Sequence, residues 1–283
     1  MRKFLRVLLI CVVLISALCT MCSLMNEQAD NSAYDDMDRY LGAQEVVIVP
    51  DNEKDNVFEY QINYEWEELL SINKEIVGWI YIPDNDYINY PVVKGTNNSF
   101  YLNHDYARKW NANGAAFIDY RYNNLCLNKI IYAHNMSRSS SRPMFTSLTD
   151  WADEEYFNSH RILYYTDANG ITSKYLIAGV CGFNVNKETN FSYLDMSFAT
   201  EEEFREWVEY IKKNSQYFDL GDDEIEYRAN EVLTLSTCDS RFGYFNNRST
   251  GRRVLFCVNL TNNELEEQTE ANDVFVDDYI NKE

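Results

Sequence analysis

Eight short runs of β-type residues occupy most of the chain between residues 78 and 260, and they limit the possible folds more than any other feature. An Asn169-Gly170 pair between the fifth and sixth runs is a hairpin signal. So many short runs predict a mostly β protein built on a closed or nearly closed antiparallel barrel. The runs are Gly78–Ile82, Asn89–Val93, Ala115–Tyr120, Lys129–His134, Arg161–Thr166, Ser173–Val185, Val232–Cys238 and Arg252–Leu260.

Three further segments carry helical signals. Tyr60–Ile72 has apolar residues at helical spacing. Pro143–Phe157 begins with a proline, which is favoured at the first position of a helix. Thr200–Tyr217 opens with a capping box formed by Thr200 and Glu203, and one face of the segment is apolar. We therefore expect helices to be added to the β structure.

The N-terminus carries an apolar segment. Basic residues occur within 1–6, and Val7–Met25 is then an uncharged run of nineteen residues. That length is close to the ~20 residues that span a bilayer, and acidic residues follow it. The pattern predicts an uncleaved single-pass membrane anchor at 7–25, with residues 1–6 in the cytoplasm and the rest outside the cell. A cleaved signal peptide is the alternative.

Two other segments are polar and acidic. Residues 26–56 show no periodicity and are predicted to be an extracellular tether, and residues 262–283 form an acidic tail. The whole chain of 283 residues has a formal net charge of −20. Because phosphate binding needs a basic surface, this charge argues against a nucleic-acid partner. Cys126, Cys181 and Cys257 lie inside apolar segments, so we expect buried free thiols there, although a bridge between two of them stays open.

The run Glu231–Cys238 ends in a cysteine. With the period of a strand, Leu233 and Leu235 lie on one face, while Ser236 and Cys238 lie on the other, more polar face. Cys238 is thus expected at the end of a strand, where a side chain can reach a cleft. A buried structural cysteine is the alternative.

His134 ends another run and is followed by a loop rich in serine and arginine. Catalytic residues often occupy such strand ends. A thiolate is a nucleophile, and a nearby imidazole or guanidinium favours its formation. Arg252 and Arg253 begin the next run after Cys238, and one of them could stabilise an oxyanion in the same cleft. Spacing alone does not choose between them.

The chain resembles a sortase of class B. The resemblance covers about residues 60–260, with histidine, cysteine and arginine in the expected order. The motifs that carry it are Tyr-Ala-His-Asn-Met at 132–136, Thr-Leu-Ser-Thr-Cys at 234–238, Arg-Arg-Val-Leu at 252–255, Val-Gly-Trp-Ile-Tyr-Ile-Pro at 77–83, Tyr-Pro-Val-Val-Lys-Gly at 90–95 and Asn-Ser-Phe-Tyr-Leu at 98–102.

The resemblance implies an eight-stranded sortase barrel as the catalytic domain, at 57–261. It also implies an N-terminal helical segment, which Tyr60–Ile72 matches, and a helix between the sixth and seventh strands, which Thr200–Tyr217 matches. The family pattern of an arginine, one variable residue and then aliphatic residues selects Arg252 over Arg253.

The implied site residues have distinct roles. Cys238 is the nucleophile, His134 the general acid and base, and Arg252 the group that binds the oxyanion. A histidine orienter is possible at Asp239. Three residues match positions that line the substrate groove: Asn98, Leu102 and Ser236.

The implied activity is that of a cysteine transpeptidase. It would cleave a C-terminal sorting signal of a secreted protein after a threonine and transfer the acyl group to a lipid-linked peptidoglycan precursor amine at the outer face of a Gram-positive cell. No metal or organic cofactor is expected. A thiol hydrolase, a pilin-polymerising sortase and a membrane-anchored β-barrel binding module are the alternatives.

Overall fold

The computed structural model describes residues 2–35, 37–41, 45–49, 57–61, 63–83, 85–136, 141–187, 190–221, 224–246 and 248–260. The predicted acidic tail at 262–283 lies outside the described residues, as does part of the predicted tether at 50–56.

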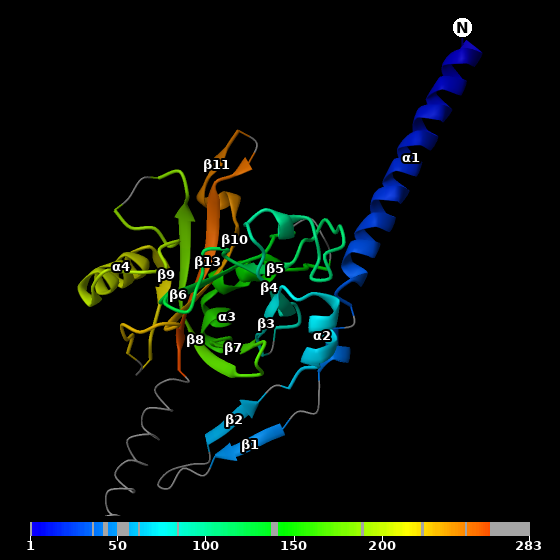
Figure 1. Ribbon diagram of the computed structural model, residues 1–283. Helices are drawn as coiled ribbons and strands as arrows, with labels where there is room; N and C mark the ends of the chain where they lie inside the picture. The colour runs from blue at the N-terminus through cyan, green and yellow to red at the C-terminus, as the bar shows by residue number, and fades with distance from the viewer. Residues whose placement is uncertain are drawn as a thin grey trace, which may run out of the picture.

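Eight strands close into a barrel (Figure 1), which confirms the predicted fold class. They hydrogen-bond in the order β13-β10-β6-β5-β4-β3-β7-β8, and β8 pairs back with β13. Two neighbouring pairs, β6 with β10 and β4 with β5, are parallel, so the barrel is not purely antiparallel as predicted. The strands are β3 (Ile76–Tyr81), β4 (Asn89–Val93), β5 (Ala116–Ile118), β6 (Asn128–Tyr132), β7 (Ile162–Asp167), β8 (Thr172–Asn184), β10 (Val232–Cys238) and β13 (Gly251–Asn259).

The barrel wall carries apolar residues on its inner face and also on its outer face where a helix packs against it. Leu233 and Leu235 of β10 belong to the core inside the barrel, whereas Val232 on the opposite face packs in a second core with α4 (Glu201–Lys213). Burial on two faces explains why β10 is buried along nearly its whole length. Cys238 shares its face with Val232, so it lies on the outer side of the wall.

The helix α4 forms as the sequence predicts and stands between the sixth and seventh barrel strands, β8 and β10. The side chain of Thr200 accepts a hydrogen bond from the Glu203 amide at 3.2 Å, and the Glu203 carboxylate accepts one from the Ala199 amide at 2.6 Å. The two contacts cap the first turn. After α4, the short strand β9 (Ser215–Phe218) joins the free edge of β8.

The predicted helix at Pro143–Phe157 is instead two short helices, η3 (Phe145–Ala152) and α3 (Glu154–Ser159). Asp153 between them is extended, and its side chain accepts a hydrogen bond from the Tyr156 amide, which starts α3 as a separate helix. The prediction failed because an aspartate inside an apolar helical pattern can act as a new N-cap.

The remaining elements are short, apart from α1. They are α1 (Arg2–Ser32), η1 (Met37–Tyr40), β1 (Glu45–Val49), β2 (Val57–Gln61), α2 (Trp66–Ile72), η2 (Phe100–Leu102), η4 (Ser240–Phe242), β11 (Tyr244–Phe245) and β12 (Arg248–Ser249). Thus α2 forms within the predicted N-terminal helical segment, and the range predicted as a tether contains helix and strand. The Asn169-Gly170 hairpin joins β7 to β8, with Gly170 at φ 84°.

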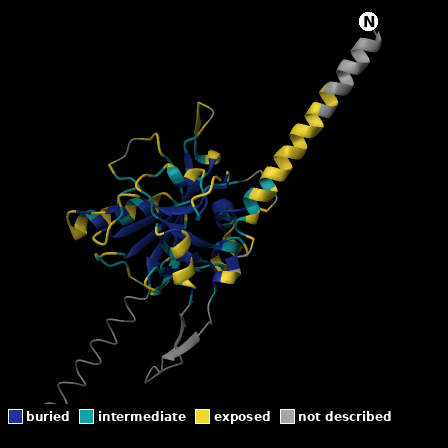
Figure 2. Cartoon of the chain, turned by 45° about the vertical axis from the view of Figure 1, so that its right-hand side comes forward, coloured by how far each residue is buried: buried dark blue, intermediate teal, exposed yellow. Residues whose placement is uncertain are grey.

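The N-terminal helix requires a correction. Within the part of the chain that the structure describes, no helix combines the length and apolar character needed to cross a membrane. This finding contradicts the predicted single-pass anchor at 7–25 and the cell-membrane location that rested on it. The helix does not end with the apolar run but continues through charged residues to Ser32. Where the structure describes their burial, most of its residues are exposed (Figure 2). Its last turns contact the domain that contains the barrel, where the Asn111 side chain donates to the Asp30 carbonyl at 2.8 Å.

Candidate active site

The cysteine and the histidine lie at neighbouring strand ends on the same end of the barrel. In the parallel pair β6–β10, Ser236 lies opposite Tyr132. Beyond this last pair, the Thr237 hydroxyl donates to the Ala133 carbonyl at 2.8 Å, and the Asn135 amide donates to the Cys238 carbonyl at 2.9 Å. These contacts fix the segment that carries His134 alongside the segment that ends in Cys238.

Cys238 is a free, half-buried thiol, in contrast to the fully buried cysteines of the chain. Cys126, Cys181 and Cys257 are buried and free, as the sequence predicts. Burial raises the pKa of the Cys181 thiol to about 12, and that of Cys257 is also raised by burial. These two thiols are therefore unsuited to nucleophilic chemistry, because the thiolate is the reactive form.

The His134 imidazole is half-buried, and its Nε2 lies 2.7 Å from the Leu102 carbonyl oxygen. A carbonyl can only accept, so Nε2 carries the hydrogen and donates it. Leu102 itself is exposed at the end of η2. The contact orients the ring and leaves Nδ1 as the nitrogen that can exchange a proton with a reacting group.

The structure separates the two arginines. Arg252 lies opposite Cys238 in the antiparallel pair β10–β13, so both side chains emerge on one face at Cβ separations of about 5 Å. Its Nη1 donates to the Ser249 and Gly251 carbonyls at 3.1 and 2.8 Å. The guanidinium carries five donors, so two such bonds do not exhaust it. Arg253 lies on the opposite face and is only 2% exposed.

Asp239 does not contact the histidine in the way the sequence suggested. Its carboxylate accepts hydrogen bonds from Arg241 at 2.7 to 3.1 Å and lies 3.5 Å from Nε of Arg253. Burial alone would raise the pKa of Asp239, but the Arg241 contacts outweigh it and hold the pKa below its usual range. Among the residues that the structure describes, its side-chain partners are thus Arg241 and Arg253, and these contacts stabilise the turn after β10.

Asn98 anchors a loop beside the site. Its side chain donates to Asp119 at 3.0 Å and accepts from the Tyr120 amide at 2.9 Å. The Asp119 carboxylate also accepts from Tyr132 and Arg121, each at 2.9 Å. Both ends of the Asn98 amide are therefore engaged, which indicates that it holds the η2 loop, and with it the Leu102 carbonyl, in place.

The sequence reasoning missed Tyr193, which lies in the connection between β8 and α4. Its hydroxyl is 3.1 Å from the Ser236 hydroxyl, and its ring stacks on Phe183. Burial raises the pKa of Tyr193, while the nearby Arg252 lowers it. Tyr193 therefore borders both Ser236 and Arg252. No local pattern marks this tyrosine, because only tertiary contact brings it to the site.

The barrel thus brings a thiol, an imidazole and a guanidinium to one end of its outer wall. Such a set can form a thioester and stabilise the oxyanion that precedes it. The residues brought to this end are Cys238, His134, Arg252, Ser236 and Leu102, with Asn98 behind the η2 loop.

Known proteins are similar to this chain in both sequence and fold. No family model matches the chain. Sortase B of Listeria monocytogenes is 30% identical over 197 residues, covering 69% of this chain and 74% of that protein. Sortase B of Bacillus anthracis in complex with AAEK1 superimposes with a TM-score of 0.62 and 27% identity, over 83% of this chain and 98% of that one. The Staphylococcus aureus sortase B–substrate complex gives a TM-score of 0.59 and 26% identity, over 69% and 84%.

An eight-stranded barrel with a half-exposed cysteine at the end of its seventh strand is the architecture of a sortase, which is a cysteine transpeptidase. Together with the likeness to the Listeria protein, it shows that the chain belongs to the sortase B family. The expected class and enzyme activity are thereby confirmed.

Proposed function

We propose that the transpeptidase reaction of this chain is carried by Cys238, His134 and Arg252, and that its substrate is a C-terminal sorting signal cleaved after a threonine. The observation that supports these roles is the pairing of Cys238 with Arg252 across β10–β13, with the His134 segment bonded alongside. The fold alone does not assign roles, because roles depend on the site.

In the first half-reaction, the Cys238 thiolate attacks the threonine carbonyl carbon and forms a carbon–sulfur bond. Arg252 donates hydrogen bonds to the oxyanion. The tetrahedral intermediate then collapses, the carbon–nitrogen bond breaks, and His134 gives its proton to the departing amine. The product is a thioester on Cys238.

In the second half-reaction, an acceptor amine attacks the thioester carbonyl and His134 takes a proton from it. The thiolate of Cys238 leaves, and a new amide joins the two substrates. We propose a peptidoglycan precursor amine, lipid-linked, as the acceptor, so that a secreted protein becomes attached to the cell wall. A substrate complex of the related S. aureus enzyme supports a peptide substrate for this chain as well.

The test uses synthetic peptides that contain threonine at a scissile bond, with and without an added amine, followed by mass spectrometry. The expected result is a thioester on Cys238 and, with amine present, a ligated peptide. Cys238→Ala is expected to abolish both while keeping the fold, and Cys126→Ala serves as the matched cysteine control. Normal turnover by Cys238→Ala would remove Cys238 from the nucleophile role.

The same assay separates the other candidate functions. Free acid as the product even with amine present would indicate a thiol hydrolase. Ladders formed with a pilin-like substrate would indicate a pilus polymerase. If Cys238 of the folded protein reacts neither with thiol-directed electrophiles nor with any peptide, the result would favour a binding module.

A further inference from the structure

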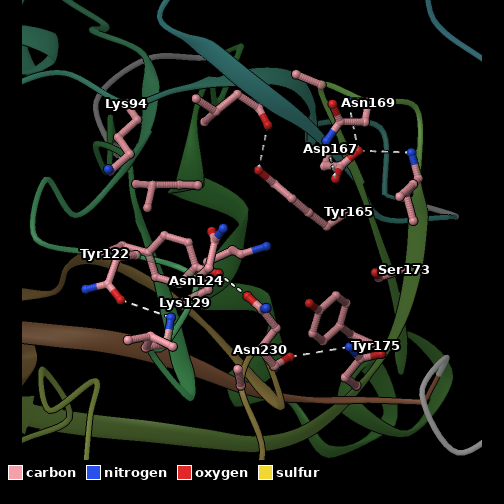
Figure 3. A pocket seen from close by; sticks show the side chains of 18 residues that line it. Lys94, Tyr122, Asn124, Lys129, Tyr165, Asp167, Asn169, Ser173, Tyr175 and Asn230 are labelled. Atoms are coloured by element: carbon pink, nitrogen blue, oxygen red, sulfur yellow. Dashed lines mark hydrogen bonds between the residues drawn. The ribbon is translucent and has the colours of Figure 1, made fainter.

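A cavity of about 1010 Å³ opens at the end of the barrel opposite Cys238. Figure 3 shows the side chains that line it. Residues that line it lie near the starts of β6 and β10 and near the end of β13. Lys129 on β6 lies opposite Leu233 in β10, and Cys238 follows five residues later, so the cavity is roughly 17 Å from the thiol. Its volume is at the upper end of the range of small-molecule sites.

The chemistry of this cavity centres on Lys129. The side chain is 9% exposed, and its ammonium lies 4.0 Å from the ring centre of Tyr165 and 5.5 Å from that of Tyr122. Within the described part of the chain, the Lys129 ammonium has no hydrogen bond or ion pair with another side chain. Aromatic faces attract a cation, but they do not accept its three hydrogens as oxygens would.

The charges around Lys129 favour an anion as its partner. Lys94 also lines the cavity. The one carboxylate of the lining is Asp167, whose Oδ1 already accepts from the Asn169 and Ile171 amides at 2.9 and 3.0 Å in the β7–β8 turn. Burial lowers the pKa of Lys129 to about 8, and Asp167 counters this only in part. The ammonium is thus a buried cation whose nearest carboxylate is engaged elsewhere.

Part of the lining suits an apolar ligand body, while asparagines and Ser173 make up much of the remainder. Tyr122, Tyr165 and Tyr175 present rings to the cavity, and Leu125 at its margin is 82% exposed. Sites for small ligands commonly combine such apolar walls with one or two polar groups that fix orientation. The two features together define a ligand with one anionic end and one apolar or aromatic end.

We propose that this cavity is a second binding site, separate from the catalytic cysteine, and that it takes a small organic carboxylate whose anionic end pairs with Lys129 and whose apolar end contacts the tyrosine rings. The site is independent of the proposed transpeptidation roles, because it shares no residue with them. The alternative is that Lys129 is a structural cation that the two tyrosine rings stabilise, with no ligand.

The first experiment measures binding of 3-phenylpropionate to the full chain by titration calorimetry or ligand-observed NMR. The uncharged 3-phenylpropanol is the matched probe. We expect saturable binding of the acid, at least tenfold tighter than that of the alcohol. Lys129→Met is expected to weaken binding of the acid at least tenfold and to leave binding of the alcohol unchanged. Lys213→Met, on the exposed end of α4, should change the binding of neither probe. Equal binding of the two probes, or no binding of either, would overturn the proposal.

A second experiment uses the unmodified chain and so does not depend on how a variant folds. N-acetoxysuccinimide transfers its acetyl group to a neutral lysine amine with loss of N-hydroxysuccinimide, and peptide mass spectrometry locates the acetyl groups. We expect 3-phenylpropionate to slow acetylation of Lys129 at least fivefold without slowing that of Lys213. Protection of both lysines, or of neither, would count against a ligand at Lys129. Peptide cleavage by Cys238 is expected to be the same in Lys129→Met and wild type.

Discussion

Two buried charges at different places on the barrel behave in opposite ways. Asp119, directly after β5, is fully buried and is surrounded by donors from Arg121, Tyr132 and Asn98. Lys129 lies at a similar height on the neighbouring strand β6, where the Ile130 carbonyl accepts from the Asp119 amide. It is almost as buried but faces aromatic rings and a cavity. Burial alone would raise the pKa of Asp119, yet the donors lower it to about 2, while burial lowers the pKa of Lys129 to about 8.

The comparison shows what each charge contributes. Asp119 is stabilised as an anion and holds the loop that positions the histidine, so it belongs to the framework of the active site. Burial destabilises the charged form of Lys129. An apolar side chain could fill the same space without this cost in folding free energy, so a structural role alone does not explain the lysine. The hydrogen bonds of Asp119 support the catalytic site. Lys129 has no hydrogen bond to a described side chain, and the proposed ligand would supply the missing acceptor.

The largest expected effect concerns the catalytic end. Arg252→Gln should lower kcat/KM for a sorting peptide by about 10²–10³-fold, because an oxyanion donor is lost. Its thermal stability should change little, since the Arg252 side chain is half-buried and its Nη1 bonds carbonyls of residues close in the chain. Peptide cleavage kinetics and thermal melting measure the two quantities.

Arg253→Gln is the matched comparison. Arg253 is buried against Asp239 and the Phe242 ring, so its loss should lower the free energy of unfolding by about 2–4 kcal/mol. Activity of the folded fraction should fall less than in Arg252→Gln. The reverse pattern, with Arg253→Gln stable and inactive, would transfer the catalytic role to Arg253.

The next effect concerns Lys129 beside the cavity. Lys129→Met should raise the free energy of unfolding at pH 7 by about 1–3 kcal/mol, because the folded state penalises the ammonium. The pKa is lowered on folding, so this cost is fully present below pH 8 and disappears as the pH rises through about 10.4. Urea unfolding at pH 7 and above pH 10.4 checks this. An equal gain at both pH values would show that the methionine acts by packing and not by charge.

Asp119→Asn should have the opposite pH dependence. Its pKa is lowered on folding, so the stabilising contribution is present above about pH 4 and is lost as the pH falls through about 2. We expect a loss of about 1–2 kcal/mol at neutral pH, discounted because Arg121 is partly exposed. Acid titration of stability in both proteins measures it. A difference that stays constant down to pH 2 would remove the charge from the explanation.

The smallest effect lies away from both charges. Thr200→Ala should lower the free energy of unfolding by about 1 kcal/mol through loss of the cap on α4. Thr200→Ser keeps the acceptor oxygen and is the control. Because α4 packs on the outer wall away from both Asp119 and Lys129, peptide cleavage and Lys129 acetylation should stay unchanged. A change in either would show that α4 links the catalytic site to the cavity.

Local sequence patterns determined the elements of this protein. Short runs of β-type residues located all eight barrel strands to within a few residues, because such residues favour the pleated, partly buried surface of a sheet. The Thr200 cap and the Asn169-Gly170 turn were likewise readable, since each acts within four residues of chain. Motif order then led to Cys238, His134 and Arg252 as candidates.

Tertiary structure alone decided the parallel pairing of β6 with β10, and with it the meeting of the histidine and cysteine segments. It also assigned Asp239 to two arginines, brought Tyr193 to Ser236 and enclosed Lys129 in a cavity. These contacts join residues that are distant in the chain or lie on different elements. Sequence patterns report what each residue prefers locally, but the partner of a buried charge depends on which strands close the barrel.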